Sequence, residues 1–154
     1  MDAWTRFVEA LFRVNGLLLE AGEGIARPIG QSSARWQVLG GLGYGPKTVA
    51  QMAREIGHAR QSVQRLADVL EREGLVGYRE KPEDRRTSLL ELTPAGMGVL
   101  TAIYNRQVEW SNRITKDLAT EQLEAVTKAL EGIGNLVEAD SKADRPAGSS
   151  QDKE

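Results

Sequence analysis

Residues 47–93 read KTVAQMAREIGHARQSVQRLADVLEREGLVGYREKPEDRRTSLLELT, and the order of segments in this stretch decides the fold. Two short amphipathic segments, Thr48–Ile56 and Arg60–Glu73, are separated by Gly57-His58-Ala59. After Gly74 the pattern changes from helical to extended. The stretch therefore predicts two helices joined by a tight turn and followed by a β-hairpin.

The first amphipathic segment carries the signals of a complete short helix. Thr48, with Gln51 three residues later, fits a capping box, in which the hydroxyl and the amide satisfy backbone N–H groups at the helix start. Gly57 then supplies a residue that adopts a left-handed conformation without a steric penalty. The apolar residues recur at the spacing of one buried helical stripe: Val49, Met52, Ala53 and Ile56.

The second amphipathic segment has a polar face whose two ends differ in charge. Basic and amide residues gather at its N-terminal end, and acidic residues gather at its C-terminal end. In the major groove, Arg bonds bidentately to guanine and Gln to adenine, while a helix N-terminus suits phosphate oxygens. The alternative is an ordinary solvated helix face. We predict base contacts from Gln61, Gln64 and Arg65, and contacts to both bases and phosphates from Arg60 and Ser62.

A charged hairpin follows the second helix. Leu75–Glu80 and Thr87–Leu92 have the composition of strands, and they flank the tip 82–86, PEDRR. A hairpin tip is narrow enough for the minor groove, where Arg is favoured by the negative potential of A·T-rich DNA. The basic residues predicted on or near this loop are Arg79, Lys81, Arg85 and Arg86.

Three segments resemble the MarR family of bacterial transcription regulators: residues 65–76, the tip 82–86 and the exit 92–96, LTPAG. The resemblance extends from about residue 4 to about residue 138. It implies a mainly α fold with a small β-wing, a winged helix-turn-helix whose N- and C-terminal helices form a dimerisation region. It also implies that Arg86 reaches the minor groove and that Asp84 orients it. The alternative for this pair is a surface ion pair of ~0–1 kcal/mol.

Long apolar helical patterns flank the central stretch on both sides. A helix is expected from Pro94 to Asp117, and a winged helix of this size does not need such helices for its own core. We therefore predict that the terminal helices intertwine with those of a second chain in a C2 homodimer, which places two recognition helices ~34–36 Å apart. An intramolecular bundle is the alternative. The predicted interface residues are Trp4, Phe7, Val8, Leu11, Leu123, Val126, Leu130, Ile133 and Val137.

The predicted organisation is a single domain over residues 1–138. About residues 30–93 form the DNA-binding lobe, and residues 1–22 and 94–138 form the dimerisation helices. Residues 139–154 are rich in Ser, Asp and Lys without an apolar period, so they are predicted to be a disordered tail.

Glycines are expected to interrupt the helices before the central stretch. Ser32 or Ser33 is expected to cap a helix that the run Gly40–Gly45 breaks. This run is not a phosphate-binding loop, because Pro46 separates it from Lys47 and because it follows a helix instead of a strand. Four earlier glycines are expected to loosen the end of the first helix and its connection: Gly16, Gly22, Gly24 and Gly30.

Composition bounds the class of protein. The 154 residues have a net charge of −2, whereas residues 47–91 hold nine Lys/Arg and eight Asp/Glu. The negative total charge argues weakly against DNA binding, because DNA is negatively charged. The slight positive excess within residues 47–91 argues weakly for it. The absence of cysteine excludes disulfides, thiolate metal sites and cysteine-based redox sensing. No stretch suits a membrane span or a signal peptide, so a cytoplasmic protein without a membrane partner is expected.

No catalytic site, metal or cofactor is predicted. His58 is the only histidine and lies in the turn between the two helices, and no motif places a nucleophile beside a base. The resemblance implies an aromatic or anionic small-molecule effector, for which Trp36 and Tyr104 are candidate walls and Arg13 or Arg35 a candidate cation.

The function expected from these features is sequence-specific binding of double-stranded DNA as a transcriptional regulator. Repression through a pseudo-palindromic operator is the form that the resemblance favours. The alternative is a winged helix that contacts another protein without reading DNA.

Overall fold

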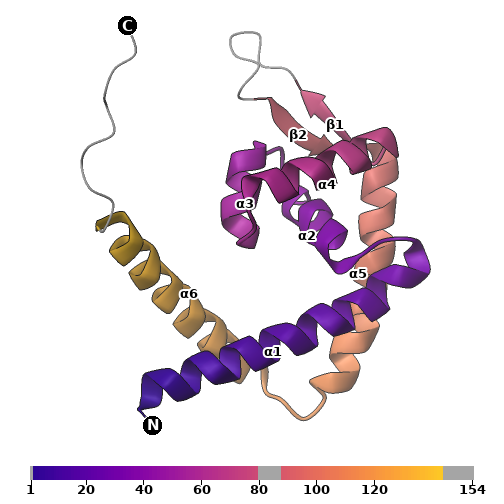
Figure 1. Cartoon of the computed structure of the whole chain (residues 1–154). Coiled ribbons are helices and arrows are strands. Elements are labelled where there is room, and N and C mark those ends of the chain that lie inside the picture. Colours follow the sequence, from indigo (N-terminus) through magenta and orange to yellow (C-terminus); the bar gives the residue numbers. More distant parts are fainter. Residues whose placement is uncertain (1, 80–87, 144–154) are drawn as a thin grey trace, which may run out of the picture. The chain divides into compact units, whose positions relative to one another are not determined.

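The computed structural model describes residues 2–79 and 88–143, which are mainly helical with one small antiparallel sheet (Figure 1). The elements are α1 (Ala3–Ala26), the 3-10 helix η1 (Arg27–Ile29), α2 (Ser33–Leu42), α3 (Val49–Ile56), α4 (Arg60–Arg72), β1 (Val76–Arg79), β2 (Leu89–Leu92), α5 (Pro94–Ile114) and α6 (Thr120–Ala143). The chain forms two compact units, one through Trp110 and one from Ser111. The predicted mainly α fold with a β-wing is confirmed.

The helix-turn-helix forms as its sequence predicts. Thr48 Oγ1 accepts a hydrogen bond from Gln51 N at 3.1 Å, and Gln51 Oε1 accepts one from Thr48 N at 2.9 Å, so the capping box at the start of α3 is complete. Gly57 ends α3 with a φ of 68°, in the left-handed region that favours glycine. Arg60 then begins α4 after a turn of three residues.

The sheet lies against the end of α4 (Figure 1). β1 and β2 pair antiparallel, with Val76 opposite Leu92 and Arg79 opposite Leu89. The other edge of β2 pairs with the segment that leads into α3, since Lys47 and Leu90 exchange backbone hydrogen bonds of 3.0 and 2.8 Å. The hairpin is therefore tied to both helices of the helix-turn-helix.

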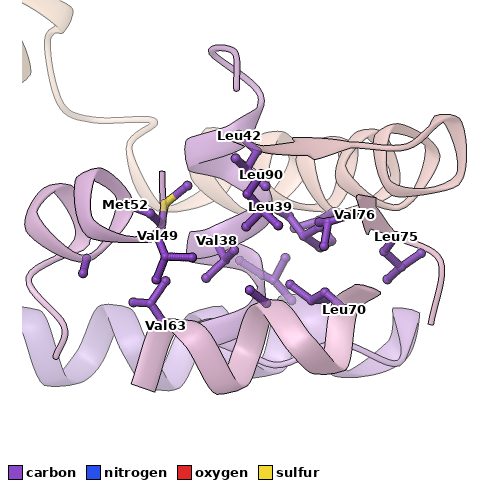
Figure 2. Packing of buried hydrophobic residues seen from close by; sticks show 14 residues of the cluster. Val38, Leu39, Leu42, Val49, Met52, Val63, Leu70, Leu75, Val76 and Leu90 are labelled. Carbon is purple, nitrogen blue, oxygen red and sulfur yellow. The ribbon is translucent and has the colours of Figure 1, made fainter. Parts of the chain in front are cut away.

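One apolar core joins α2, α3, α4 and the sheet (Figure 2). Its fully buried members include Leu39 from α2, Met52 from α3, Leu70 from α4 and Leu90 from β2. Ile103 of α5 is also fully buried in this cluster. The cluster also includes Ile25 of α1 and Val76 of β1, and this close packing fixes the direction in which α4 presents its remaining face.

The expectation that glycines loosen α1 was wrong. The helix is continuous to Ala26 through Gly16, Gly22 and Gly24. Gly22 faces α2, and a Cβ there would lie 2.9 Å from Ser33 Oγ. The missing side chain at this position therefore permits a close approach of two helices. Gly30, with a φ of 73°, does mark the connection that follows.

The expected break at the run Gly40–Gly45 is also too early. α2 includes Gly40 and Gly41 and ends at Leu42. A Cβ on Gly41 would lie 2.6 Å from Met52 Sδ, so this glycine accommodates the packing of α3 on α2. Ser32 provides the N-cap of α2, accepting a hydrogen bond from Arg35 N at 3.2 Å.

The C-terminal helices differ from their predicted bounds. α5 ends at Ile114, three residues before the predicted end, whereas α6 continues through Ala143. Residues 139–143 were predicted to be disordered and are helical, and residues 144–154 lie outside the described part of the chain. Lys142 lies 3.7 Å from Glu138, an i,i+4 ion pair of the kind that supports exposed helices. None of the described helices combines the length and apolarity that a membrane crossing requires.

Candidate nucleic-acid interface

α4 exposes the face that the sequence predicted to contact DNA. Its apolar residues Val63, Ala67 and Leu70 are buried, and Figure 2 shows Val63 and Leu70 in one cluster with Val38 and Leu39 of α2. The opposite face is thereby directed to solvent. Of the residues predicted to contact DNA on this helix, Arg60, Gln61 and Arg65 are exposed and Ser62 and Gln64 are half-buried.

The start of α4 differs from the starts of the helices before it. Asp2, Ser32 and Thr48 cap α1, α2 and α3 through side-chain oxygens. The N-cap of α4 is Ala59, and no side chain of a described residue caps this helix. The first backbone N–H groups of a helix need acceptors from outside it, and its dipole favours an anion there. This end of α4 can therefore receive a phosphate oxygen.

The distribution of charged side chains along α4 also favours an anion at its N-terminal end. Arg60 and Arg65, in the first half, make no ion pair with a described residue. Two of the acidic residues towards its C-terminal end have partners in the protein, since Glu73 is paired with Arg35 and Asp68 accepts a hydrogen bond. The unpaired positive charge is concentrated at the uncapped end.

Gln64 makes contacts that the sequence analysis missed. Its Nε2 donates to Asp68 Oδ1 and to the Tyr78 hydroxyl, both at 2.8 Å. Tyr78 lies on β1, so this side chain joins the recognition helix to the wing. Burial raises the pKa of Tyr78 above its ordinary value, while the hydrogen bond from Gln64 lowers it. The i,i+4 spacing of Gln64 and Asp68 was readable from the sequence, but the pairing with Tyr78 depends on the fold.

The structure places one of the predicted wing residues. Arg79 is exposed and forms an ion pair of 2.6 Å with Glu91 on the neighbouring strand. A contact from Arg79 to a phosphate competes with this ion pair. The other residues predicted for the wing, Lys81, Asp84, Arg85 and Arg86, lie outside the described residues.

A hollow of about 540 Å³ between α2 and α5 brings together the two aromatic residues predicted to face a ligand, Trp36 and Tyr104. Tyr44, Met97 and Leu100 also line it, and no residue of its lining is charged. Arg13 and Arg35, the predicted ligand cations, are not part of this lining, and Arg35 is engaged with Glu73.

Apolar side chains are exposed along α1 and α6. On α1, Trp4 and Leu11 are exposed, Phe7 and Val8 are half-buried, and Phe12 is 69% exposed. On α6, which has no buried residue, Leu123, Val126, Leu130 and Val137 are exposed and Ile133 is half-buried. Large apolar surfaces of this kind are characteristic of protein–protein interfaces.

Sequence comparison places the chain among known proteins. A sequence model of the MarR family matches residues 29–87. An uncharacterized protein of Mycobacterium tuberculosis is 38% identical over 129 residues, which cover 84% of this chain and 90% of that protein. This chain belongs to the MarR family.

Solved structures of MarR-family regulators share its fold. AbsC from Streptomyces coelicolor superposes with a TM-score of 0.76 at 22% identity, covering 90% of this chain and 97% of AbsC. The transcriptional repressor CouR, bound to a 23-mer DNA duplex, superposes with a TM-score of 0.71 at 26% identity. The match covers 81% of this chain and 89% of the CouR chain. CouR from Rhodococcus jostii bound to p-coumaroyl-CoA has a TM-score of 0.73 at 24% identity, with coverages of 80% and 88%.

Members of the MarR family are transcription regulators, which are not enzymes. As a member, this protein has a DNA-binding winged helix. Within the described ranges, no three His, Asp or Glu residues are grouped as a metal site requires. The individual DNA, ligand and dimer residues stay predictions, and the structure adds Tyr78 to them as a partner of Gln64.

Proposed function

We propose that this MarR-family protein is a repressor that binds a pseudo-palindromic operator as a homodimer. The observation that carries the proposal is the start of α4, where Arg60, Gln61 and Arg65 are exposed around a helix N-terminus that no described side chain caps. In this arrangement, the backbone N–H groups bind a phosphate and fix the register, while side chains of the first two turns contact base edges. The solved complex of the similar repressor CouR with DNA supports the assignment.

Arg65 is expected to contribute most to base recognition. It lies in the second turn of α4, is exposed, and has no ion-pair partner among the described residues. We expect Arg65→Ala to weaken operator binding by about 1–3 kcal/mol, or roughly 5- to 150-fold, because a bidentate contact to guanine is lost. Fluorescence anisotropy with a labelled operator duplex measures this change.

Arg72→Ala is the matched control. It removes the same charge from the same helix, but at the end where Arg72 Nε donates to the Asp68 backbone oxygen at 3.3 Å. We expect a much smaller change than for Arg65→Ala. Equal losses for the two variants would mean that α4 contributes only a diffuse charge and does not read bases.

The operator is sought first in DNA that flanks the protein's own gene. We expect saturable binding that resists random competitor DNA and weakens steeply as salt rises, because phosphate binding releases counterions. Binding no tighter than to random duplex would call for genome-wide selection of bound fragments. If that selection also returned no enriched sequence, the alternative of a winged helix that contacts another protein would hold instead.

The homodimer is proposed from the apolar surfaces of α1 and α6. Phe12 is 69% exposed and Val126 is 57% exposed in a single chain, and burial of such side chains is worth about 1.5–3 kcal/mol each. We expect light scattering at micromolar concentration to give twice the chain mass of 16.9 kDa. We expect Val126→Glu to shift the mass towards the monomer, whereas Glu124→Lys, an exposed neighbour, leaves it unchanged. A wild-type monomer would rule out an operator read by two recognition helices.

An effector site is proposed in the hollow between α2 and α5. Trp36 and Tyr104 offer aromatic walls, and the uncharged lining favours a neutral ring over a carboxylate. A ligand releases DNA only if it binds the DNA-incompetent dimer more tightly than the competent one. The test is a screen of aromatic compounds for lowered operator affinity, repeated with Tyr104→Ala. A compound that acts equally on both proteins would bind elsewhere.

A further inference from the structure

The hydrogen bonds of Gln64 restrict what this residue can offer to DNA. Its carboxamide nitrogen carries two hydrogens, and Nε2 donates to Asp68 Oδ1 and to the Tyr78 hydroxyl at 2.8 Å each. Both donors of the amide are therefore engaged within the protein. A carboxylate at neutral pH only accepts, so the partner Asp68 also fixes which end of the amide is nitrogen.

The Tyr78 hydroxyl is positioned to accept the hydrogen bond from Gln64. A tyrosine is protonated at neutral pH at its ordinary pKa, and burial raises the pKa of Tyr78 further. Tyr78 lies on β1 opposite Leu90 of β2 and packs, half-buried, against the apolar core. In this position its hydroxyl oxygen accepts the hydrogen bond of 2.8 Å from Gln64 Nε2.

The carbonyl oxygen of Gln64 remains available. Among the described residues, Gln31 alone buries a side-chain polar atom without a hydrogen-bond partner, so Gln64 Oε1 is open to solvent. Gln64 follows Gln61 by three residues and precedes Arg65 by one, which places it within the polar face of α4.

We infer that Tyr78 is a specificity-determining residue that acts by position, because it holds the Gln64 nitrogen and leaves only the carbonyl oxygen to face the bases. This inference rests on the proposed function, since it requires α4 to lie in the major groove. Tyr78 itself need not touch DNA.

The restriction changes which bases Gln64 accepts. A free Gln reads adenine with both ends of its amide, the oxygen on N6 and the nitrogen on N7. Gln64 as held here only accepts, so it pairs with an exocyclic amine, which adenine presents at N6 and cytosine at N4. Guanine and thymine present carbonyl oxygens there and are rejected. The operator position that faces Gln64 therefore tolerates adenine and cytosine alike.

The test is selection of bound sequences from a randomised duplex pool with the full-length protein and two variants. Gln64→Ala identifies the operator position, because preference is lost there. Tyr78→Phe keeps the ring and removes only the hydroxyl, which frees one hydrogen of Nε2. At the same position we expect Tyr78→Phe to favour adenine over cytosine about fivefold or more, as a bidentate contact becomes possible.

The controls separate positioning from a structural effect. Ser141→Ala removes the hydroxyl of an exposed residue of α6, which donates to the Val137 backbone oxygen at 2.9 Å, and is expected to select the wild-type sequences. The salt dependence of Tyr78→Phe is expected to match the wild type, because phosphate contacts are untouched. Identical sequences selected by wild type and Tyr78→Phe would overturn the inference while leaving the proposed function intact. A wild type that enriches no sequence would overturn both.

Discussion

Gly96→Ala is expected to destabilise this protein by about 3 kcal/mol or more, because the new side chain meets backbone. A Cβ at Gly96 would lie 1.8 Å from the Leu75 carbonyl oxygen and 2.9 Å from its carbon. That oxygen accepts a hydrogen bond of 3.1 Å from Thr93 N, so it cannot move away without breaking the joint between the sheet and α5. The urea-induced unfolding midpoint, measured at fixed protein concentration, reports the loss.

Gly98→Ala is the matched control for this prediction. Gly98 lies in the same helix, and a Cβ there would have no neighbour within 4 Å. Alanine at an open helical position stabilises by about 0.5–1 kcal/mol relative to glycine. The two variants are thus expected to change stability in opposite directions. A Gly96→Ala protein as stable as the wild type would show that α5 and Leu75 are further apart than the structure places them.

Local sequence signals predicted the helix-turn-helix and the hairpin. The capping box of Thr48 and Gln51 and the left-handed Gly57 act within a few residues, so their geometry follows from the sequence alone. The antiparallel pairing of β1 and β2 likewise joins neighbouring segments. In the same way, the burial of Val63, Ala67 and Leu70 follows from helical periodicity, and this burial leaves the polar face of α4 in solvent.

Features that depend on contacts between distant segments were not predictable in this way. A glycine in a sequence can either interrupt a helix or allow two elements to pack closely, and only the fold shows which of the two applies. Gly22 and Gly41 are of the second kind, because Ser33 and Met52 occupy the space of a side chain. The hydrogen bond between Gln64 and Tyr78 is another example, since it requires the orientation of β1 against α4. For this reason the sequence predicted which face of α4 contacts DNA but not which atoms of Gln64 remain free.

Leu70→Ala is expected to destabilise the protein by about 2–5 kcal/mol, through lost burial and the cavity left in the core. Leu70 is fully buried, and it lies on the opposite side of α4 from Arg65. Its loss removes the packing that fixes the recognition helix on α2 and the sheet (Figure 2). Chemical denaturation gives the change in free energy of unfolding.

Leu66→Ala, on the same helix, is the control for this effect. Leu66 is half-buried and packs against the margin of the core, so its truncation is expected to cost less than that of Leu70. Operator binding by Leu70→Ala is expected to fall in proportion to the unfolded fraction, whereas Arg65→Ala weakens binding without a loss of stability. Equal stability losses at Leu66 and Leu70 would contradict the packing of α4 described here. If Arg65→Ala instead weakened binding only by unfolding the protein, the separation of α4 into a structural face and a reading face would fail.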